Sequence, residues 1–116
     1  MAIEEDSRGV VLALVKALND EEFDDARRYV SKDLSFSGVL GSRQGADAYF
    51  EDMKRMRLKY DVKKVFSDET DVCLFYDLTM SGTTVFVSAW YQVEDGRVHS
   101  LKVVFDPRLL LAAKAA

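Results

Sequence analysis

Two aspartates stand out in the sequence because each lies in or beside a strongly apolar segment. Asp77 interrupts the run Val72–Met80, and Asp106 directly follows Val103-Val104-Phe105. A carboxyl group held in apolar surroundings has a raised pKa and can donate or accept a proton near neutral pH. The pair therefore predicts general acid/base chemistry, with Asp106 as the principal acid or base and Asp77 as its helper.

Both aspartates also have a purely structural interpretation. Asp106 precedes Pro107, and Asp-Pro commonly begins a turn in which the carboxylate accepts hydrogen bonds from nearby backbone N–H groups. Asp77 can instead form an ion pair with a lysine or point away from the sheet. The sequence leaves these alternatives open.

Further polar and aromatic residues are candidates for contacting a ligand. Among them are Tyr49, Tyr76, Phe86, Ser88, Trp90, Tyr91 and Lys102. Period-two alternation places Lys102 on the same strand face as Asp106, and it places Trp90 on the same face as Phe86 and Ser88. A core role for the tryptophan and a solvated role for the lysine are the alternatives, because alternation alone does not say which face lines a pocket.

The apolar spacing predicts helices in the first half of the chain and strands in the second. Apolar residues at spacings of three and four indicate amphipathic helices, and period-two segments separated by turn signals indicate consecutive antiparallel hairpins. The expected helices cover about 6–18, 21–30 and 46–58, and the expected strands cover 34–37, 62–66, 72–80, 83–93 and 98–105. This order predicts an α+β fold with helices on one face of a curved sheet.

Five short strings, spread over nearly the whole chain, carry a family signal. They are Leu18–Asp24, Ser31–Phe36, Gly45-Ala46, Asp95–Val98 and Phe105–Pro107. In this order and spacing they resemble the nuclear transport factor 2-like superfamily, and within it the small SnoaL-like and ketosteroid-isomerase-like proteins. The resemblance implies a cone-shaped, curved antiparallel sheet with a mixed edge, wrapped around three N-terminal helices as a cystatin-like barrel. It also implies a pocket between helices and sheet, and a dimer formed through the sheet.

The resemblance bears on both aspartates. Asp106 falls where SnoaL-like cyclases and limonene epoxide hydrolases carry a catalytic aspartate, and Asp77 falls near the second aspartate of those hydrolases. Phe75 stands where those hydrolases have an arginine, so epoxide hydrolysis is not expected. The groups that ketosteroid isomerase uses are also replaced, so its mechanism is not expected either.

Composition limits the possible classes of protein. The chain has 116 residues, 48% of them hydrophobic, which suits a single domain over 1–116 with a short helix-prone tail at 109–116. A net charge of −4 disfavours nucleic acid as a partner. The lone Cys73, expected to be buried, and the single histidine allow no disulfide and no Cys/His metal set, so neither cofactor nor metal is expected. An acidic start and the lack of a long apolar run predict a cytoplasmic protein that does not contact membranes.

These observations predict a pocket protein that binds a small apolar or aromatic molecule. A cofactor-free isomerase, cyclase or dehydratase reaction is the catalytic version of this hypothesis. The alternative is a dimerisation or partner-docking module with a vestigial pocket. In either case, the apolar residues on both faces of Val72–Met80 predict a homodimer through the sheet.

Overall fold

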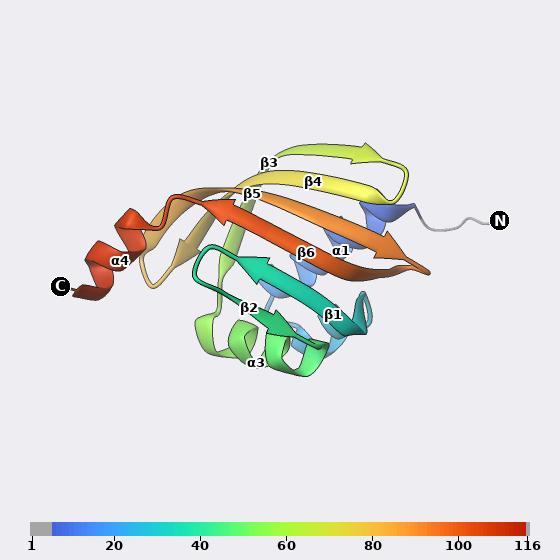
Figure 1. Cartoon of the computed structure of the whole chain (residues 1–116), viewed down its shortest axis with the longest axis horizontal. Coiled ribbons are helices and arrows are strands. Elements are labelled where there is room, and N and C mark those ends of the chain that lie inside the picture. The colour runs from blue at the N-terminus through green and yellow to red at the C-terminus, as the bar shows by residue number, and fades with distance from the viewer. Residues whose placement is uncertain (1–5, 116) are drawn as a thin grey trace.

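The computed structural model describes residues 6–115, so the acidic residues 1–5 and the end of the expected tail lie outside the described part. The chain folds into four helices and six strands within this range (Figure 1). Their bounds are α1 Ser7–Asn19, α2 Phe23–Arg27, β1 Val30–Gly38, β2 Gly41–Gln44, α3 Ala46–Met56, β3 Lys59–Asp68, β4 Asp71–Met80, β5 Thr83–Glu94, β6 Arg97–Phe105 and α4 Arg108–Ala115.

The six strands form one curved sheet that does not close. Their order is β2-β1-β6-β5-β4-β3, so β2 and β3 are the two edges. All neighbouring strands are antiparallel except β1 and β6, which run parallel. Helices α1 and α3 lie on one side of the sheet (Figure 1), and this confirms the predicted α+β fold with a mixed sheet edge.

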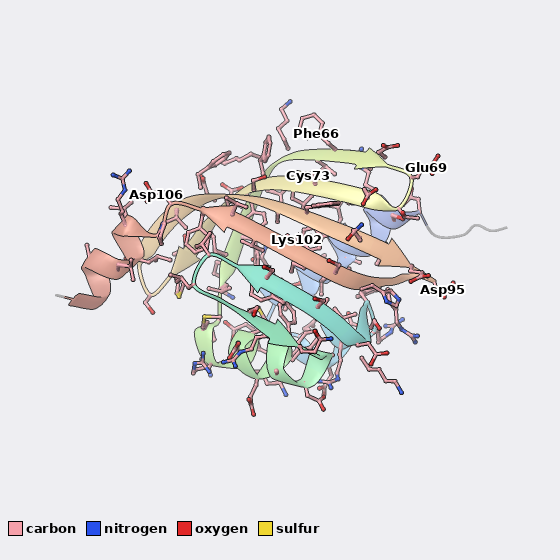
Figure 2. All side chains as sticks on the ribbon, in the orientation of Figure 1. Phe66, Glu69, Cys73, Asp95, Lys102 and Asp106 are labelled. Carbon is pink, nitrogen blue, oxygen red and sulfur yellow. The ribbon has the colours of Figure 1, made fainter. Side chains whose placement is uncertain are left out.

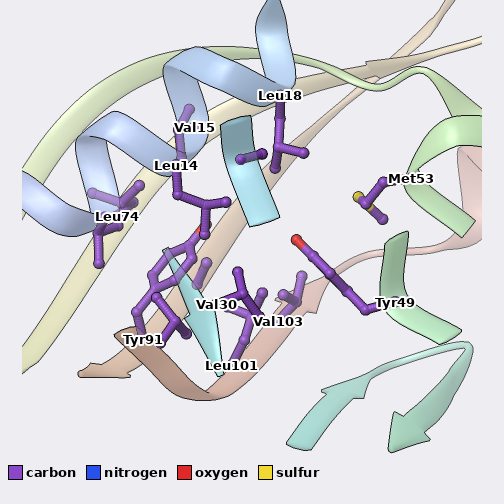
Figure 3. Close-up of a cluster of buried hydrophobic side chains, with 14 of the residues drawn as sticks. Leu14, Val15, Leu18, Val30, Tyr49, Met53, Leu74, Tyr91, Leu101 and Val103 are labelled. Atoms are coloured by element: carbon purple, nitrogen blue, oxygen red, sulfur yellow. The ribbon is translucent and has the colours of Figure 1, made fainter. Parts of the chain in front are cut away.

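Helix α1 begins at a side-chain cap and buries one face. The carboxylate of Asp6 accepts a hydrogen bond from the backbone N–H of Gly9 at 2.7 Å, which satisfies a donor that the first helical turn leaves unpaired. The buried face comprises Val10, Val11, Leu14, Val15, Ala17 and Leu18. Among them, Leu14 lies next to Leu74 and Tyr91 of the sheet (Figure 3). Burial of this stripe is therefore the main force that holds α1 on the sheet.

The end of α1 is fixed to the start of β3 by one side chain. Asn19 accepts a hydrogen bond from the backbone N–H of Tyr60 at 2.7 Å and donates one to its carbonyl oxygen at 2.9 Å. Helix α3 begins after Gly45, whose φ of 95° is strained for residues with a Cβ. It buries Tyr49, Phe50 and Met53.

Cross-strand register divides the sheet into two faces. The inner face, toward α1 and α3, carries a row formed by Val65, Leu74, Ala89 and Val103. The outer face carries rows that place Phe66, Cys73, Trp90 and Lys102 side by side, Phe75 beside Ser88 and Val104, and Asp77 beside Phe86. Along β4 the inner residues are buried and the outer ones are partly exposed. The sheet therefore has one covered face and one open face.

Several boundaries differ from the sequence expectations. Helix α2 is one short turn-like helix, Phe23–Arg27, because the chain must enter β1 at Val30 in order to pair with β6. No strand was expected between 37 and 46, but this segment contains β2, which pairs with β1 across the turn Val39-Leu40. The tail forms α4 as its composition indicated, and its Leu110 is buried. In residues 6–115, no helix has both the length and the hydropathy needed to span a membrane.

The packing of α1 on the sheet leads to a stability prediction. Leu74 is fully buried against this helix, so Leu74→Ala is expected to lower the free energy of unfolding by about 2–5 kcal/mol through lost burial and a residual cavity. Leu109→Ala is the matched control, because Leu109 is 61% exposed and should change stability by less than about 0.5 kcal/mol. Urea unfolding followed by circular dichroism measures both. Equal effects of the two substitutions would contradict the assignment of the inner face.

Candidate functional site

A pocket of about 420 Å³ lies between α3, the β1–β2 hairpin and the inner face of the sheet. Its apolar lining comes from every one of these elements. The principal apolar residues are Phe36, Val39, Leu40, Met53, Met56, Leu58, Leu78, Met80, Leu101, Val103 and Phe105. This volume is within the usual range for small-molecule sites.

Four tyrosines from four elements meet in this pocket. Tyr49 comes from α3, Tyr60 from β3, Tyr76 from β4 and Tyr91 from β5, and all four belong to the lining. The rings of Tyr60 and Tyr76 pack edge to face with centroids 5.0 Å apart. The hydroxyl of Tyr60 also donates to Sδ of Met53 at 3.6 Å. Figure 3 shows the hydroxyl of Tyr49 directed from α3 into the interior.

Burial keeps these tyrosines neutral. Tyr49, Tyr76 and Tyr91 are at most 3% exposed, and Tyr60 is partly buried. Removal from water disfavours the tyrosinate anion, so burial raises the pKa of all four hydroxyls, and their mutual proximity raises it further for Tyr60 and Tyr91. A neutral phenol can donate a hydrogen bond to a ligand oxygen but is a poor base. The cluster is therefore suited to hydrogen bonding rather than proton abstraction.

The charged residues of the described lining are Arg43, Asp52 and Arg55, and both arginines contact Asp52. The carboxylate of Asp52 accepts hydrogen bonds from Nε of Arg43 at 2.7 Å and from Nη2 at 3.3 Å. Nη1 of Arg55 lies 3.1 Å from the same carboxylate. The Arg43 guanidinium, with help from Arg55, lowers the pKa of Asp52, so this carboxylate is ionised at neutral pH. Neither the lining nor any other part of residues 6–115 contains a group of three or more His, Cys, Asp or Glu side chains able to hold a metal ion.

Asp106 lies outside the pocket lining. It follows β6 and lies beside α4 (Figure 2), where its carboxylate accepts hydrogen bonds from the backbone N–H and the guanidinium of Arg108. These bonds lower the pKa of Asp106 to about 2. The predicted apolar surroundings and raised pKa are therefore wrong for Asp106, because the side chain is exposed and paired. The turn interpretation fits the observed contacts.

Asp77 and four of the ligand-binding candidates lie on the outer face of the sheet. Nζ of Lys63 is 3.9 Å from the Asp77 carboxylate, as the ion-pair alternative proposed. Trp90 donates through Nε1 to Asp71 at 2.9 Å, and Nζ of Lys102 lies 5.1 Å from the Trp90 ring centroid. Their expected neighbours Phe86 and Ser88 share this face.

The structure therefore separates the predicted site residues into two groups. Tyr49, Tyr76 and Tyr91 line the pocket. Across the sheet from it lie Asp77, Phe86, Ser88, Trp90 and Lys102. Cys73 was expected to be buried, but it is partly exposed because it belongs to the same outer face (Figure 2).

Sequence patterns pointed to Tyr49, Tyr76 and Tyr91 as cavity residues, but not to Tyr60 and not to the arginine–aspartate cluster. The signal for Tyr76 and Tyr91 is that they share a strand face with aliphatic residues such as Leu74 and Ala89. The other face of each strand contains charged residues. A strand face without charges is the one that a globular fold buries. No local pattern pointed to the contact of Arg43 with Asp52, because it joins an edge strand to a helix.

Comparisons with known proteins agree with this geometry. The chain matches the SnoaL-like domain family over residues 11–101. A nuclear transport factor 2-like protein of unknown function from Cytophaga hutchinsonii is 40% identical, with 96% of this chain and 99% of that one covered and a TM-score of 0.91. No curated protein sequence matches the chain significantly.

Two more distant structures share the fold alone. An LEH-like epoxide hydrolase from M. tuberculosis is 23% identical, covers 94% of this chain and 95% of its own, and has a TM-score of 0.74. An uncharacterised cystatin-fold protein from Novosphingobium aromaticivorans is 15% identical, covers 86% and 98%, and has a TM-score of 0.77.

The curved sheet and the helices on its inner face define a protein of the nuclear transport factor 2-like, or cystatin-like, fold class. Within that class, the chain belongs to the SnoaL-like domain family.

The buried tyrosines predict an alkaline transition. Their folded-state pKa lies above the unfolded value of about 10, so the stability contributed by the neutral hydroxyls is complete below pH 10 and is lost as pH rises through the folded-state pKa. The absorbance change caused by ionisation of the four clustered tyrosines should therefore occur well above pH 10 in the folded protein. In urea, where the protein is unfolded, it should occur near pH 10. Tyr49→Phe should remove part of the change above pH 10, whereas Tyr29→Phe, outside the cluster, should leave it intact. A full tyrosinate signal near pH 10 without unfolding would contradict this burial.

Proposed function

We propose that this protein binds a small apolar or aromatic molecule in the pocket between α3, the β1–β2 hairpin and the inner face of the sheet. The observation that carries the proposal is an open cavity of about 420 Å³ whose lining includes buried residues of the hydrophobic core. Empty apolar volume costs stability, so a cavity large enough for a multi-ring compound is best explained by a ligand.

The polar groups of the lining narrow the class of ligand. The hydroxyls of Tyr49, Tyr60, Tyr76 and Tyr91 are surrounded by apolar residues, and a ligand oxygen placed among them receives hydrogen bonds in a site with little competing water. A carbonyl or hydroxyl group on an apolar skeleton fits this environment. The fold neighbour named as an epoxide hydrolase supports a small molecule as the occupant of this fold.

Catalysis by the two predicted aspartates has little support from the geometry. Asp106 is paired with Arg108 and Asp77 is on the outer face, so neither carboxylate reaches the pocket lining. Asp52 does line the pocket, but its pairing with Arg43 weakens it as a base. Ligand binding is therefore the better supported function, and a cofactor-free isomerase, cyclase or dehydratase reaction is the less supported one. The vestigial-pocket alternative has less support still, because the cavity is open.

A pair of neighbouring valines tests the pocket. Val103 points into it, whereas Val104 is 63% exposed on the outer face. Val103→Phe should fill part of the cavity and weaken binding of 2-acetylnaphthalene by at least about tenfold, and Val104→Phe should leave binding unchanged. Ligand-detected NMR gives both dissociation constants, and circular dichroism checks that both variants fold. Equal affinities for the two variants would contradict binding in this pocket.

We also propose that two copies of the chain associate through the outer face of the sheet. Phe66, Phe86, Trp90 and Val104 are 42–63% exposed there. Phe75 links Phe66 and Phe86, with ring centroids 5.7 and 5.9 Å away. Such a contiguous aromatic surface is unusual for a monomer.

A second copy suits this face better than an unrelated partner. Charges of both signs stand next to the aromatic residues, with Lys63 and Lys102 near Asp77 and Asp71. A two-fold axis brings each patch against its own copy, so lysines of one protomer can meet aspartates of the other.

Phe86→Glu tests the dimer. A charge at this exposed aromatic position should convert a wild-type dimer to a monomer, because it would be buried unpaired in the interface. Leu40→Glu is the control, since Leu40 is 58% exposed but lies at the hairpin tip. Analytical ultracentrifugation gives the masses. A monomeric wild type, or a dimer that tolerates Phe86→Glu, would contradict the proposal.

A further inference from the structure

The pocket runs from an exposed charged end to a buried hydroxyl end. The side chains of Arg43 and Arg55 are 51% and 65% exposed, whereas Tyr49 and Tyr91 are almost inaccessible. Residues of both groups belong to one lining, which also contains apolar side chains such as Met53 on the same helix as Tyr49. A ligand that fills this pocket therefore meets guanidinium groups at its outer end.

The charged end carries an unbalanced positive charge. Two guanidinium groups share the single carboxylate of Asp52, which is only 13% exposed. The neighbouring Glu51 is exposed and acts on Arg43 only through space. It does not belong to the lining. Within the lining, one positive charge is left without a partner.

The arginines also retain free hydrogen-bond donors. Arg43 contacts Asp52 through Nε and Nη2, and Arg55 contacts it through Nη1. Among the described residues, Nη1 of Arg43 and both Nε and Nη2 of Arg55 have no acceptor on the protein. Asp52 thus orients two guanidinium groups whose remaining N–H donors are available to an anion.

We propose that the ligand of this pocket is an apolar monocarboxylate whose carboxylate is bound at the outer end by Arg55 and Arg43, with Asp52 as the positioning residue. This rests on the proposed binding function and adds the chemical class of the ligand. A carboxylate matches the planar donor pairs of guanidinium and carries the one charge that the lining leaves unbalanced. A phosphate monoester carries nearly two charges at neutral pH and fits this balance less well.

A matched pair of ligands separates the inference from the binding function. The sodium salt of 2-naphthoic acid and 2-acetylnaphthalene have the same ring system and nearly the same size, but only the first is charged. Isothermal titration calorimetry on the full chain at low salt should give naphthoate an affinity about tenfold higher. This preference should fall as sodium chloride is added, because part of the charged end is exposed to solvent.

Variants assign the preference to the arginine cluster. Arg55→Met should remove most of the preference by lowering naphthoate affinity, with a much smaller change in acetylnaphthalene affinity, because the Arg43–Asp52 pair remains intact. Arg55→Lys should restore part of it. Arg28→Met is the charge-matched control, since Arg28 is an exposed arginine paired with Asp25 outside this pocket, and it should preserve the preference.

The outcomes distinguish the two proposals. Equal wild-type affinities for naphthoate and acetylnaphthalene would overturn the carboxylate inference and leave the binding pocket in place. A preference that survives Arg55→Met would also overturn it. Lack of binding by both compounds would overturn the pocket proposal, and the inference with it.

Discussion

Helix α1 covers only part of the inner sheet face, and the pocket exists because of this. The helix buries one stripe against part of the sheet, where Val11, Leu14 and Leu74 are almost inaccessible to solvent. Asn19 then fixes its end to Tyr60, so the chain cannot slide along the sheet. Helix α3 and the β1–β2 hairpin cover the remaining inner surface, and a pocket lies between them and the sheet. The parallel pairing of β1 with β6 keeps the hairpin in this position.

In the same arrangement, the polar groups of the pocket differ in their distance from solvent. Tyrosines on α3, β3, β4 and β5 converge in the interior because each occupies an inward position of its element. Burial keeps them neutral, so they can form hydrogen bonds without bringing a charge into the core. Arginines are placed at the exposed end, where their charges remain partly hydrated. A ligand that satisfies both ends is amphipathic, and the two ends specify its orientation.

Sequence patterns were sufficient for the class of fold but not for the site. Helical spacing in α1 and alternation in β4 and β5 follow directly from burial, so these elements were predicted close to their observed bounds. The short α2 and the edge strand β2 were mispredicted, because tertiary pairing of β1 decides where both begin and end. Such long-range pairing leaves no local pattern.

The position of the candidate site could not be predicted for a related reason. Alternation groups Phe86, Ser88 and Trp90 on one face, but which face the helices cover is a tertiary property. Asp106 was placed in apolar surroundings because its neighbours in sequence are apolar, yet Arg108 and solvent surround its carboxylate. The charges on Asp77 and Lys102 indicated that their strand face is exposed to solvent, because burial of an unpaired charge costs free energy.

Methionine methyl NMR can show whether a ligand occupies the pocket. Three of the four methionines in the chain, Met53, Met56 and Met80, line the pocket. With [methyl-¹³C]methionine-labelled protein, addition of 2-naphthoate should shift these three signals and produce nuclear Overhauser effects between them and the naphthalene protons. Unchanged signals of Met53, Met56 and Met80, at a naphthoate concentration that saturates binding in calorimetry, would show that the ligand binds elsewhere and would contradict binding in this pocket.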